Sequence, residues 1–316
     1  MMHYLARLLL LMIPMMLGVS FLTFAVFRII PGDATHFICP YCTEDQRELL
    51  RHDLGLDRAW LSQYAHWLTG LFTGDLGESY FTHLPVTTEL ARRLPVTLEL
   101  MALTVVLSLA LGVPLGIISA IRANTPLDWL ARFVGVLWLS VPSFYTATLA
   151  IVFGLLWFGW TPPQFGDGYV SPFEDPFTNL EEFFLPALIL AFGSAGFIMR
   201  LTRSSMLEVL RNDYIRTAWA KGLRERSVVW RHAMKNALMP VLTVIGLEIG
   251  GLIGGAVIME SIFGLNGVGV YILTAVITRD ILVVQTLALM FAAVYVILNL
   301  LVDIGYAWLD PRIRYG

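Results

Sequence analysis

The two cysteines of this 316-residue chain, Cys39 and Cys42, stand in the string C-P-Y-C. A C-x-x-C pair can exchange disulfides when a helix N-terminus lowers the pKa of its thiol. Redox pairs of this kind follow a strand in a βαβ unit, whereas this pair follows a long apolar run without strand-like alternation. A structural zinc ion needs four ligands, and His36 and His52 lie nearby. We expect a local disulfide or two thiols; the alternatives are a thiol–disulfide oxidoreductase and a zinc site.

Other motifs that carry enzyme chemistry are missing from the sequence. The only lysines, Lys221 and Lys235, precede glycine and asparagine, so neither completes the G-x-x-x-x-G-K-[ST] loop that cradles ATP phosphates. The patterns H-E-x-x-H and G-x-S-x-G are also absent. The glycine-rich string F-G-L-N-G-V-G at residues 263–269 follows no strand, and we interpret it as a turn. The sequence therefore predicts no catalytic residue, no bound cofactor and no metal.

Composition predicts that the chain lies in a lipid bilayer. It is 57% hydrophobic and 14% charged, with a mean hydropathy of +0.71, whereas soluble domains have roughly 45–50% apolar and 25% charged residues. A helix crosses the hydrocarbon core with about 20 mainly apolar residues. We expect an all-α polytopic membrane protein whose first apolar segment is retained and not cleaved as a signal peptide. Six segments are candidate spans: 8–30, 96–121, 129–160, 183–199, 237–259 and 283–308.

The charges of the connecting segments predict an orientation. Residues 200–236 carry nine basic and three acidic residues, whereas residues 161–182 carry five acidic and no basic ones. Because basic loops stay in the cytoplasm, we expect segment 200–236 inside, segment 161–182 outside and both termini inside. The predicted order is a first membrane helix (1–30), an external helical subdomain (31–95), a membrane core (96–309) and a cytoplasmic tail (310–316).

A few polar residues interrupt the spans. Ionisable side chains within a membrane are candidates for function, and a proline frees a backbone carbonyl that cavity water or neighbours must satisfy. Glu99 begins the second span, where we favour an interfacial carboxylate near Arg92 or Arg93, which a short surface helix would carry. The alternative for the proline in the third span is a kink that serves packing alone. The candidate pathway residues are Ser140, Pro142, Ser143, Phe144, Glu248 and Glu260.

The fifth span is rich in glycine. Small residues four apart let helix backbones approach closely in lipid, where no hydrophobic force drives association. We expect this helix to pack closely, within the chain or against a partner. The glycines concerned are Gly246, Gly250 and Gly254, with Gly251 and Gly255 as a second pair.

The basic segment 200–236 is too long for a simple turn. Its pattern predicts a helix, a break at Gly222 and a second helix. Ala218 and Gly222 lie one turn apart and would leave a surface that another protein can approach. The alternative is a basic loop that rests on anionic lipid.

This segment resembles the coupling loop of ABC importer permeases, and more narrowly the first permease subunit of the dipeptide, oligopeptide and nickel group. Arg216-Thr217-Ala218, Gly222 and Leu238-Met239-Pro240 stand where the family pattern E-A-A-x-x-x-G…I-x-L-P has its fixed residues. Further matching strings run along nearly the whole chain, among them I-P-G-D-A-T, G-D-L-G-E-S-Y, R-L-P-V-T-L-E-L and L-D-P-R-I-R. Asn266 replaces a common proline, and C-P-Y-C lies outside the family pattern.

The resemblance implies a type I ABC importer permease that forms half of a pore in a bacterial inner membrane. Its partners would be a homologous second permease, two ATP-binding subunits and an external substrate-binding protein, with ATP and Mg²⁺ on the ATPases. The solutes would be di- or oligopeptides, or alternatively nickel chelates, glutathione or opines. A secondary transporter, which works without ATPase partners, is a further alternative. The residues implied for coupling are Asp213, Tyr214, Arg216, Thr217, Ala218, Lys221, Gly222 and Leu223.

Overall fold

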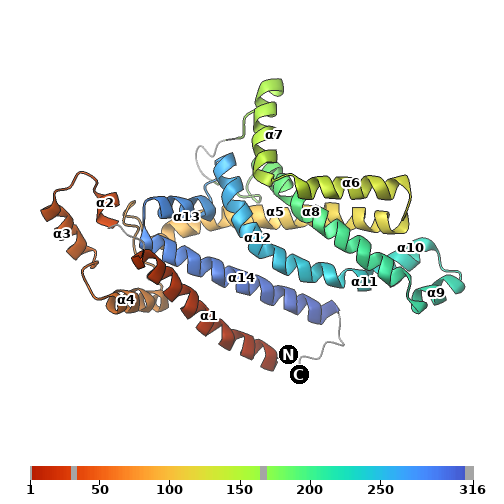
Figure 1. Cartoon of the computed structure of the whole chain (residues 1–316), viewed down its shortest axis with the longest axis horizontal. Coiled ribbons are helices and arrows are strands. Elements are labelled where there is room, and N and C mark those ends of the chain that lie inside the picture. Colours follow the sequence, from red (N-terminus) through yellow and green to blue (C-terminus); the bar gives the residue numbers. More distant parts are fainter. Residues whose placement is uncertain (1, 30–33, 164–168, 310–316) are drawn as a thin grey trace. The chain divides into compact units, whose positions relative to one another are not determined.

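The computed structural model describes residues 2–29, 34–163 and 169–309, with side chains described for all of these except residues 2–9, 27, 28, 34, 37, 247, 249 and 301–309. The chain is helical (Figure 1) and divides into two compact units. Among the described residues, unit 1 comprises 2–29, 34–96 and 266–296, and unit 2 comprises 97–163, 169–265 and 297–309.

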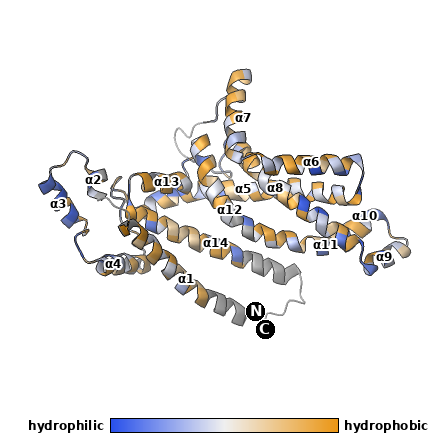
Figure 2. Cartoon of the chain, in the orientation of Figure 1, coloured by the Kyte–Doolittle hydropathy of each residue, from blue (hydrophilic) through white to orange (hydrophobic). Residues whose placement is uncertain are grey.

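Unit 1 combines helices from the first third of the sequence with α13 and the start of α14. It contains α1 (Met2–Ile29), α2 (Ala34–Ile38), α3 (Glu44–Asp53), α4 (Trp60–Thr73), the start of α5 (Val86–Ile121), α13 (Val268–Ile277) and the start of α14 (Ile281–Leu309). Figure 2 shows α3 as mainly hydrophilic, in contrast to the apolar α1. A buried cluster joins α5, α13 and α14 through Val86, Val268, Tyr271, Ala275, Val283, Val284 and Leu287. Burial raises the pKa of Asp280, whose carboxylate accepts a 2.6 Å hydrogen bond from Ser79 Oγ.

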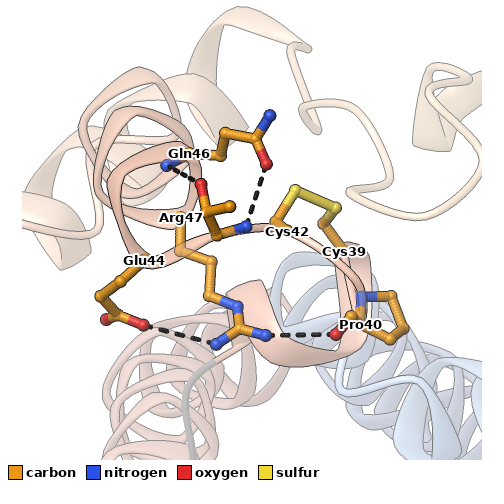
Figure 3. The surroundings of a disulfide bond; sticks show 7 residues. Cys39, Pro40, Cys42, Glu44, Gln46 and Arg47 are labelled. Atoms are coloured by element: carbon orange, nitrogen blue, oxygen red, sulfur yellow. Dashed lines mark hydrogen bonds and ion pairs between the residues drawn. A yellow bond between two sulfur atoms is a disulfide. The ribbon is translucent and has the colours of Figure 1, made fainter.

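Cys39 and Cys42 form a disulfide between α2 and α3 (Figure 3). Directly after it, Thr43 is the N-cap of α3 and forms a capping box with Gln46. Thr43 Oγ1 accepts a hydrogen bond from the backbone N–H of Gln46, and Gln46 Oε1 accepts one from the backbone N–H of Thr43. Arg47 donates a 3.2 Å hydrogen bond to the Pro40 carbonyl inside the disulfide loop. The pair therefore belongs to a local turn that precedes a capped helix.

The helix of the second predicted span begins ten residues earlier than expected. Residues 86–121 form one continuous helix, α5, so no separate surface helix carries Arg92 and Arg93, and the boundary expected at residue 95 falls inside α5. Arg93 pairs with Glu89 at 2.9 Å, one turn away. Glu99, for which the sequence predicts an interfacial carboxylate near Arg92 or Arg93, accepts a 2.6 Å hydrogen bond from Tyr169 Oη.

The third predicted span is not one helix. Unit 2 contains α6 (Pro126–Ser140) and α7 (Ser143–Phe158), which meet at 94°. Pro142 is the N-cap of α7, since its fixed φ of −60° with an extended ψ ends one helix and starts the next. Among the described residues, three helices are long and apolar enough to cross a membrane, and up to five spans result if each bent pair counts as one. The class is as predicted, but the count of six is not reproduced.

Unit 2 is organised around α8 (Pro176–Leu210), which packs against α6, α7 and α12 (Met239–Phe263) (Figure 1). One face of α8 lies against α5 and α6 at backbone distance. A Cβ atom built on Gly112 would lie 2.7 Å from the Ala195 carbonyl oxygen, and one on Gly116 would lie 2.7 Å from that of Met199. A Cβ on Gly196 would lie 2.6 Å from the Gly135 carbonyl oxygen. Only glycine permits this spacing.

An ion pair with a buried carboxylate joins the same three helices. Arg203 on α8 donates from Nε and Nη2 to the two carboxylate oxygens of Asp128 on α6, both at 2.8 Å. Ser119 Oγ on α5 and the backbone N–H of Asn124 also donate to Asp128, which is fully buried. All described partners of this carboxylate are donors, which is the condition under which a buried charge is stable.

Candidate functional site

A cavity of about 680 Å³ opens on the other side of α8. It lies where the α6–α7 break faces the middle of α8 and the middle of α12. The side chains that line it are mainly apolar: Leu137, Trp138, Leu139, Val141, Pro142, Ser143, Thr146, Leu149, Ile189, Leu190, Phe192, Gly193, Ser194, Phe197, Glu248, Gly251, Leu252 and Gly255. Sites that bind small molecules have this size and an apolar lining with few polar groups.

Glu248 is the one ionisable residue among those that line the cavity. Its Oε2 accepts a 2.8 Å hydrogen bond from Ser194 on α8. α12 bends by 55° between Met239–Gly246 and Gly250–Phe263, so Glu248 lies within the bend. The structure thus brings together three of the predicted pathway residues, Pro142, Ser143 and Glu248.

The other three predicted pathway residues lie elsewhere. Ser140 and Phe144 are exposed beside the α6–α7 break and do not line the cavity. Glu260 is fully buried, and its Oε1 accepts a 2.6 Å hydrogen bond from Thr97 on α5. The surroundings of Glu260 therefore fit a helix-packing role and not a place on the cavity wall.

The predicted glycines of α12 differ in their contacts. A Cβ on Gly255 would lie 2.7 Å from Leu190 Cδ1, so this glycine permits the contact with α8. Cβ atoms on Gly251 and Gly254 would meet no heavy atom within 4 Å. Gly246 is buried and Gly250 is half-buried. Close packing within the chain is thus observed at Gly255, whereas Gly251 and Gly254 face open space in this single chain.

The basic segment folds as a short amphipathic helix with a helical continuation. It contains α9 (Asp213–Ala220), α10 (Glu225–Ser227), the π-helix η1 (Val228–Ala233) and α11 (Met234–Ala237). Ile215 and Ala218, three residues apart on α9, are buried at 0% and 6% exposure. They pack into a cluster with Ile117, Ala120, Met206, Val209, Val228, Val229, Ala233 and Ala237. The expectation that Ala218 lies on an approachable surface is wrong, because it faces the core of its own chain.

The opposite face of α9 is exposed. It presents Asp213, Tyr214, Arg216, Thr217, Trp219 and Lys221. Arg216 and Asp213 pair at 3.3 Å, and Tyr214 Oη accepts a 2.8 Å hydrogen bond from Asn236. Gly222 ends the turn at a φ of +73°, and its amide bonds to the Trp219 carbonyl. That left-handed conformation explains the glycine, and half-buried Leu223 then packs against the cluster.

Several residues that matter in the structure were not singled out from the sequence. Trp219 is 46% exposed on the outer face of α9, where large apolar groups mark contact surfaces. Gly112 and Gly116 form a G-x-x-x-G pattern that could have predicted the contact between α5 and α8. No comparable signal joins Asp128 to Arg203. Among the described residues, no group of three or more His, Cys, Asp or Glu side chains could hold a metal ion.

The segment between α7 and α8 contains a tyrosine with a raised pKa. Burial and the hydrogen bond to Glu99 raise the pKa of Tyr169 to about 12. The phenol therefore remains a donor at every physiological pH and holds the 169–175 segment to α5.

Known proteins resemble this chain over nearly its whole length. A family model described as "Binding-protein-dependent transport system inner membrane component" matches residues 112–315, and the model of the corresponding N-terminal region matches residues 1–101. A putative peptide transport system permease protein of Brucella abortus is 41% identical over 304 residues, covering 96% of each chain. The dipeptide transport system permease protein DppB of Alkalihalophilus pseudofirmus is 37% identical over 333 residues, covering 100% of each chain.

Solved structures support the fold. A chain of the MetNI methionine ABC transporter in an inward-facing conformation is 17% identical, with a TM-score of 0.58 over 71% of this chain and 97% of that one. A second crystal form of the same transporter gives a TM-score of 0.57.

Proposed function

Because the chain belongs to the family of binding-protein-dependent transport system inner membrane components, we propose that it forms one half of a peptide-import pathway and is driven through α9. It is a permease subunit of an ABC importer and not an enzyme. The cavity between the α6–α7 break, α8 and α12 is its part of the pathway.

The partners follow from this role. A homologous second permease completes the pore, two ATPase subunits bind ATP and Mg²⁺, and an external binding protein delivers the solute. This chain binds no nucleotide. Its basic segment 200–236 faces the cytoplasm with both termini, and segment 161–182 faces outside, which is the arrangement that the positive-inside rule favours.

The substrate class rests on relatives. The Brucella abortus and Alkalihalophilus pseudofirmus proteins are named as peptide and dipeptide permeases. Small peptides are therefore the first solutes to test, with nickel chelates, glutathione and opines as the alternatives within this transporter group.

The two-faced geometry of α9 is the observation that supports coupling. Its inner face packs on the ends of α5 and α8 through Ile215 and Ala218. Its outer face, including Trp219, is left exposed in this chain. A force applied to α9 would reach α8 through contiguous packed side chains, and α8 forms one wall of the cavity. Domain rocking driven from such a contact would alternate the access to the cavity.

The test separates the two faces in the complete transporter. Trp219→Ala should lower peptide uptake and ATPase stimulation at least tenfold with an unchanged melting temperature. Ala218→Leu should lower the melting temperature first, because it overpacks a closed cluster. Trp60→Ala is the matched control, since Trp60 is 60% exposed in unit 1 and should leave uptake unchanged. Normal uptake by the Trp219→Ala and Gly222→Arg variants would contradict coupling through α9.

A further inference from the structure

We propose that Glu248 recognises the protonated amino group of the solute as it passes through the cavity of unit 2. This inference rests on the proposed import function and adds the charge class that the pathway prefers. Glu248 acts by transient contact, so it sets the rate of passage and not the affinity of the binding protein.

The first argument is the isolation of the carboxylate. Its neighbours in the lining are mainly Leu, Ile, Phe, Trp and Gly, and no Lys, Arg or His is among the described lining residues. Ser194 donates to Oε2, whereas Oε1 has no hydrogen-bond partner among the described residues. A carboxylate with one neutral donor in an apolar, intramembrane setting is costly to retain, and such residues mark solute and ion pathways.

The second argument is chemical complementarity. An alkylammonium group carries a positive charge and N–H donors, and one of these donors could bond to Oε1 of Glu248. A hydrogen bond to a charged group is about twice as strong as one between neutral groups. An unmodified peptide carries an α-amino group with a pKa of about 7.7–8.0, so most molecules are protonated at neutral pH. Anionic groups would meet only repulsion from Glu248.

The third argument is position. Glu248 lies in the bend of α12, and the α6–α7 break with Pro142 and Ser143 forms another wall of the same cavity. Breaks and bends are where helices change their relative angle. A carboxylate at this point would hold the solute where the pathway changes shape.

Transport by the reconstituted transporter with its partner subunits gives the first test. Two probes differ by one group: alanyl-alanine carries the ammonium group, and propionyl-alanine lacks it. With the binding protein saturated, Glu248→Gln should lower uptake of alanyl-alanine per ATP hydrolysed about tenfold and should not lower uptake of propionyl-alanine. Ser194→Ala removes the hydrogen bond between α8 and α12 but should keep the preference for alanyl-alanine. Equal losses for both probes, or none, would overturn the proposal.

A second test does not depend on peptides as substrates. Ser143→Cys, in a Cys39→Ser, Cys42→Ser background, puts a thiol on the cavity wall. Positively charged aminoethyl methanethiosulfonate should modify it about tenfold faster than the negatively charged sulfonatoethyl reagent, after correction for their rates with free thiol. Glu248→Gln should abolish this preference, and persistence of the preference would sink the idea. If the intact transporter takes up neither peptide probe, the peptide substrate class fails, and this labelling still decides the role of Glu248.

Discussion

The two faces of α8 have opposite character. Toward α5 and α6, the helix meets backbone through glycines and ends in the buried Asp128–Arg203 pair. Toward α7 and α12, Gly193, Ser194 and Phe197 of the same helix border a cavity. A period of 3.6 residues places these two sets on different sides of one helix.

The packed face of α8 holds helices together, whereas the face that borders the cavity belongs to the proposed pathway. The closed face joins α8 to α5, and α9 packs at the same ends of these two helices through Ile215 and Ala218. Across the cavity from the open face, α12 carries Glu248, the one ionisable residue of the lining, and two glycines, Gly251 and Gly254, at which an added Cβ would meet no heavy atom within 4 Å. We infer that α5, α6, α8 and α9 move together, and that the cavity changes where α7 and α12 meet this block.

The largest effect should follow from removing the buried carboxylate on the closed face. Asp128→Ala leaves Arg203 without its ion-pair partner. Loss of one partner of a fully buried pair costs about 3–5 kcal/mol, and the 21% exposure of the Arg203 side chain lowers this cost. The expected result is a large fall in the melting temperature of the purified complex and poor recovery from membranes.

Asp213→Ala is the matched control for Asp128→Ala. Its carboxylate pairs with Arg216 at the surface, with 95% of the side chain exposed, so no measurable change of melting temperature is expected. Similar losses of melting temperature for both variants would show that burial does not distinguish the two ion pairs. The Asp128–Arg203 pair would then not be the main stabilising contact of the closed face.

A smaller effect should separate the glycines of the two faces. In Gly196→Ala, the new Cβ would meet the Gly135 carbonyl oxygen at 2.6 Å, and overpacking of this kind costs about 1–3 kcal/mol. Gly254→Ala meets no atom within 4 Å in this chain, so the melting temperature should not fall. The measurement is thermal unfolding of both variants in detergent.

A larger side chain at position 254 tests which molecule covers this part of α12. Gly254→Leu should lower co-purification with the second permease if that partner covers this part of α12, while the fold of the chain stays intact. Unchanged co-purification would leave lipid as the neighbour of this face.

Hydropathy and charge were sufficient for the class and for much of the order of the helices. Long apolar runs predicted the all-α membrane class, and the pattern of the basic segment 200–236 predicted a helix, a break at Gly222 and a second helix, as the structure has them. At Pro142 the sequence predicts a kink within one span. A proline removes one backbone hydrogen bond, but the sequence does not determine the angle between the two helical segments that results. The early start of α5 differs from the prediction because Arg92 and Arg93 indicated a separate short helix along the membrane surface, whereas Arg93 pairs with Glu89 one turn back on α5 itself.

The site was predictable only in part for a related reason. Pro142, Ser143 and Glu248 could be chosen one by one as unusual residues in apolar helices, and the structure brings them to one cavity. Glu260 looked equivalent in sequence, but its place against Thr97 depends on how α5 packs on α12. Ala218 was assigned outward, although its spacing from Ile215 on an amphipathic helix already indicated a buried face.

The smallest effect is expected in unit 1, at the disulfide before α3. Cys39→Ser with Cys42→Ser removes a disulfide that closes a short loop before α3, and short loops gain little from cross-linking. The capping box of Thr43 and Gln46 remains and still begins α3. ATP-dependent uptake by the complete transporter should therefore stay near that of the unmodified protein, with at most a slight fall in melting temperature. A loss of uptake comparable to that of Trp219→Ala would place function in unit 1 and would revive thiol chemistry at C-P-Y-C as a hypothesis.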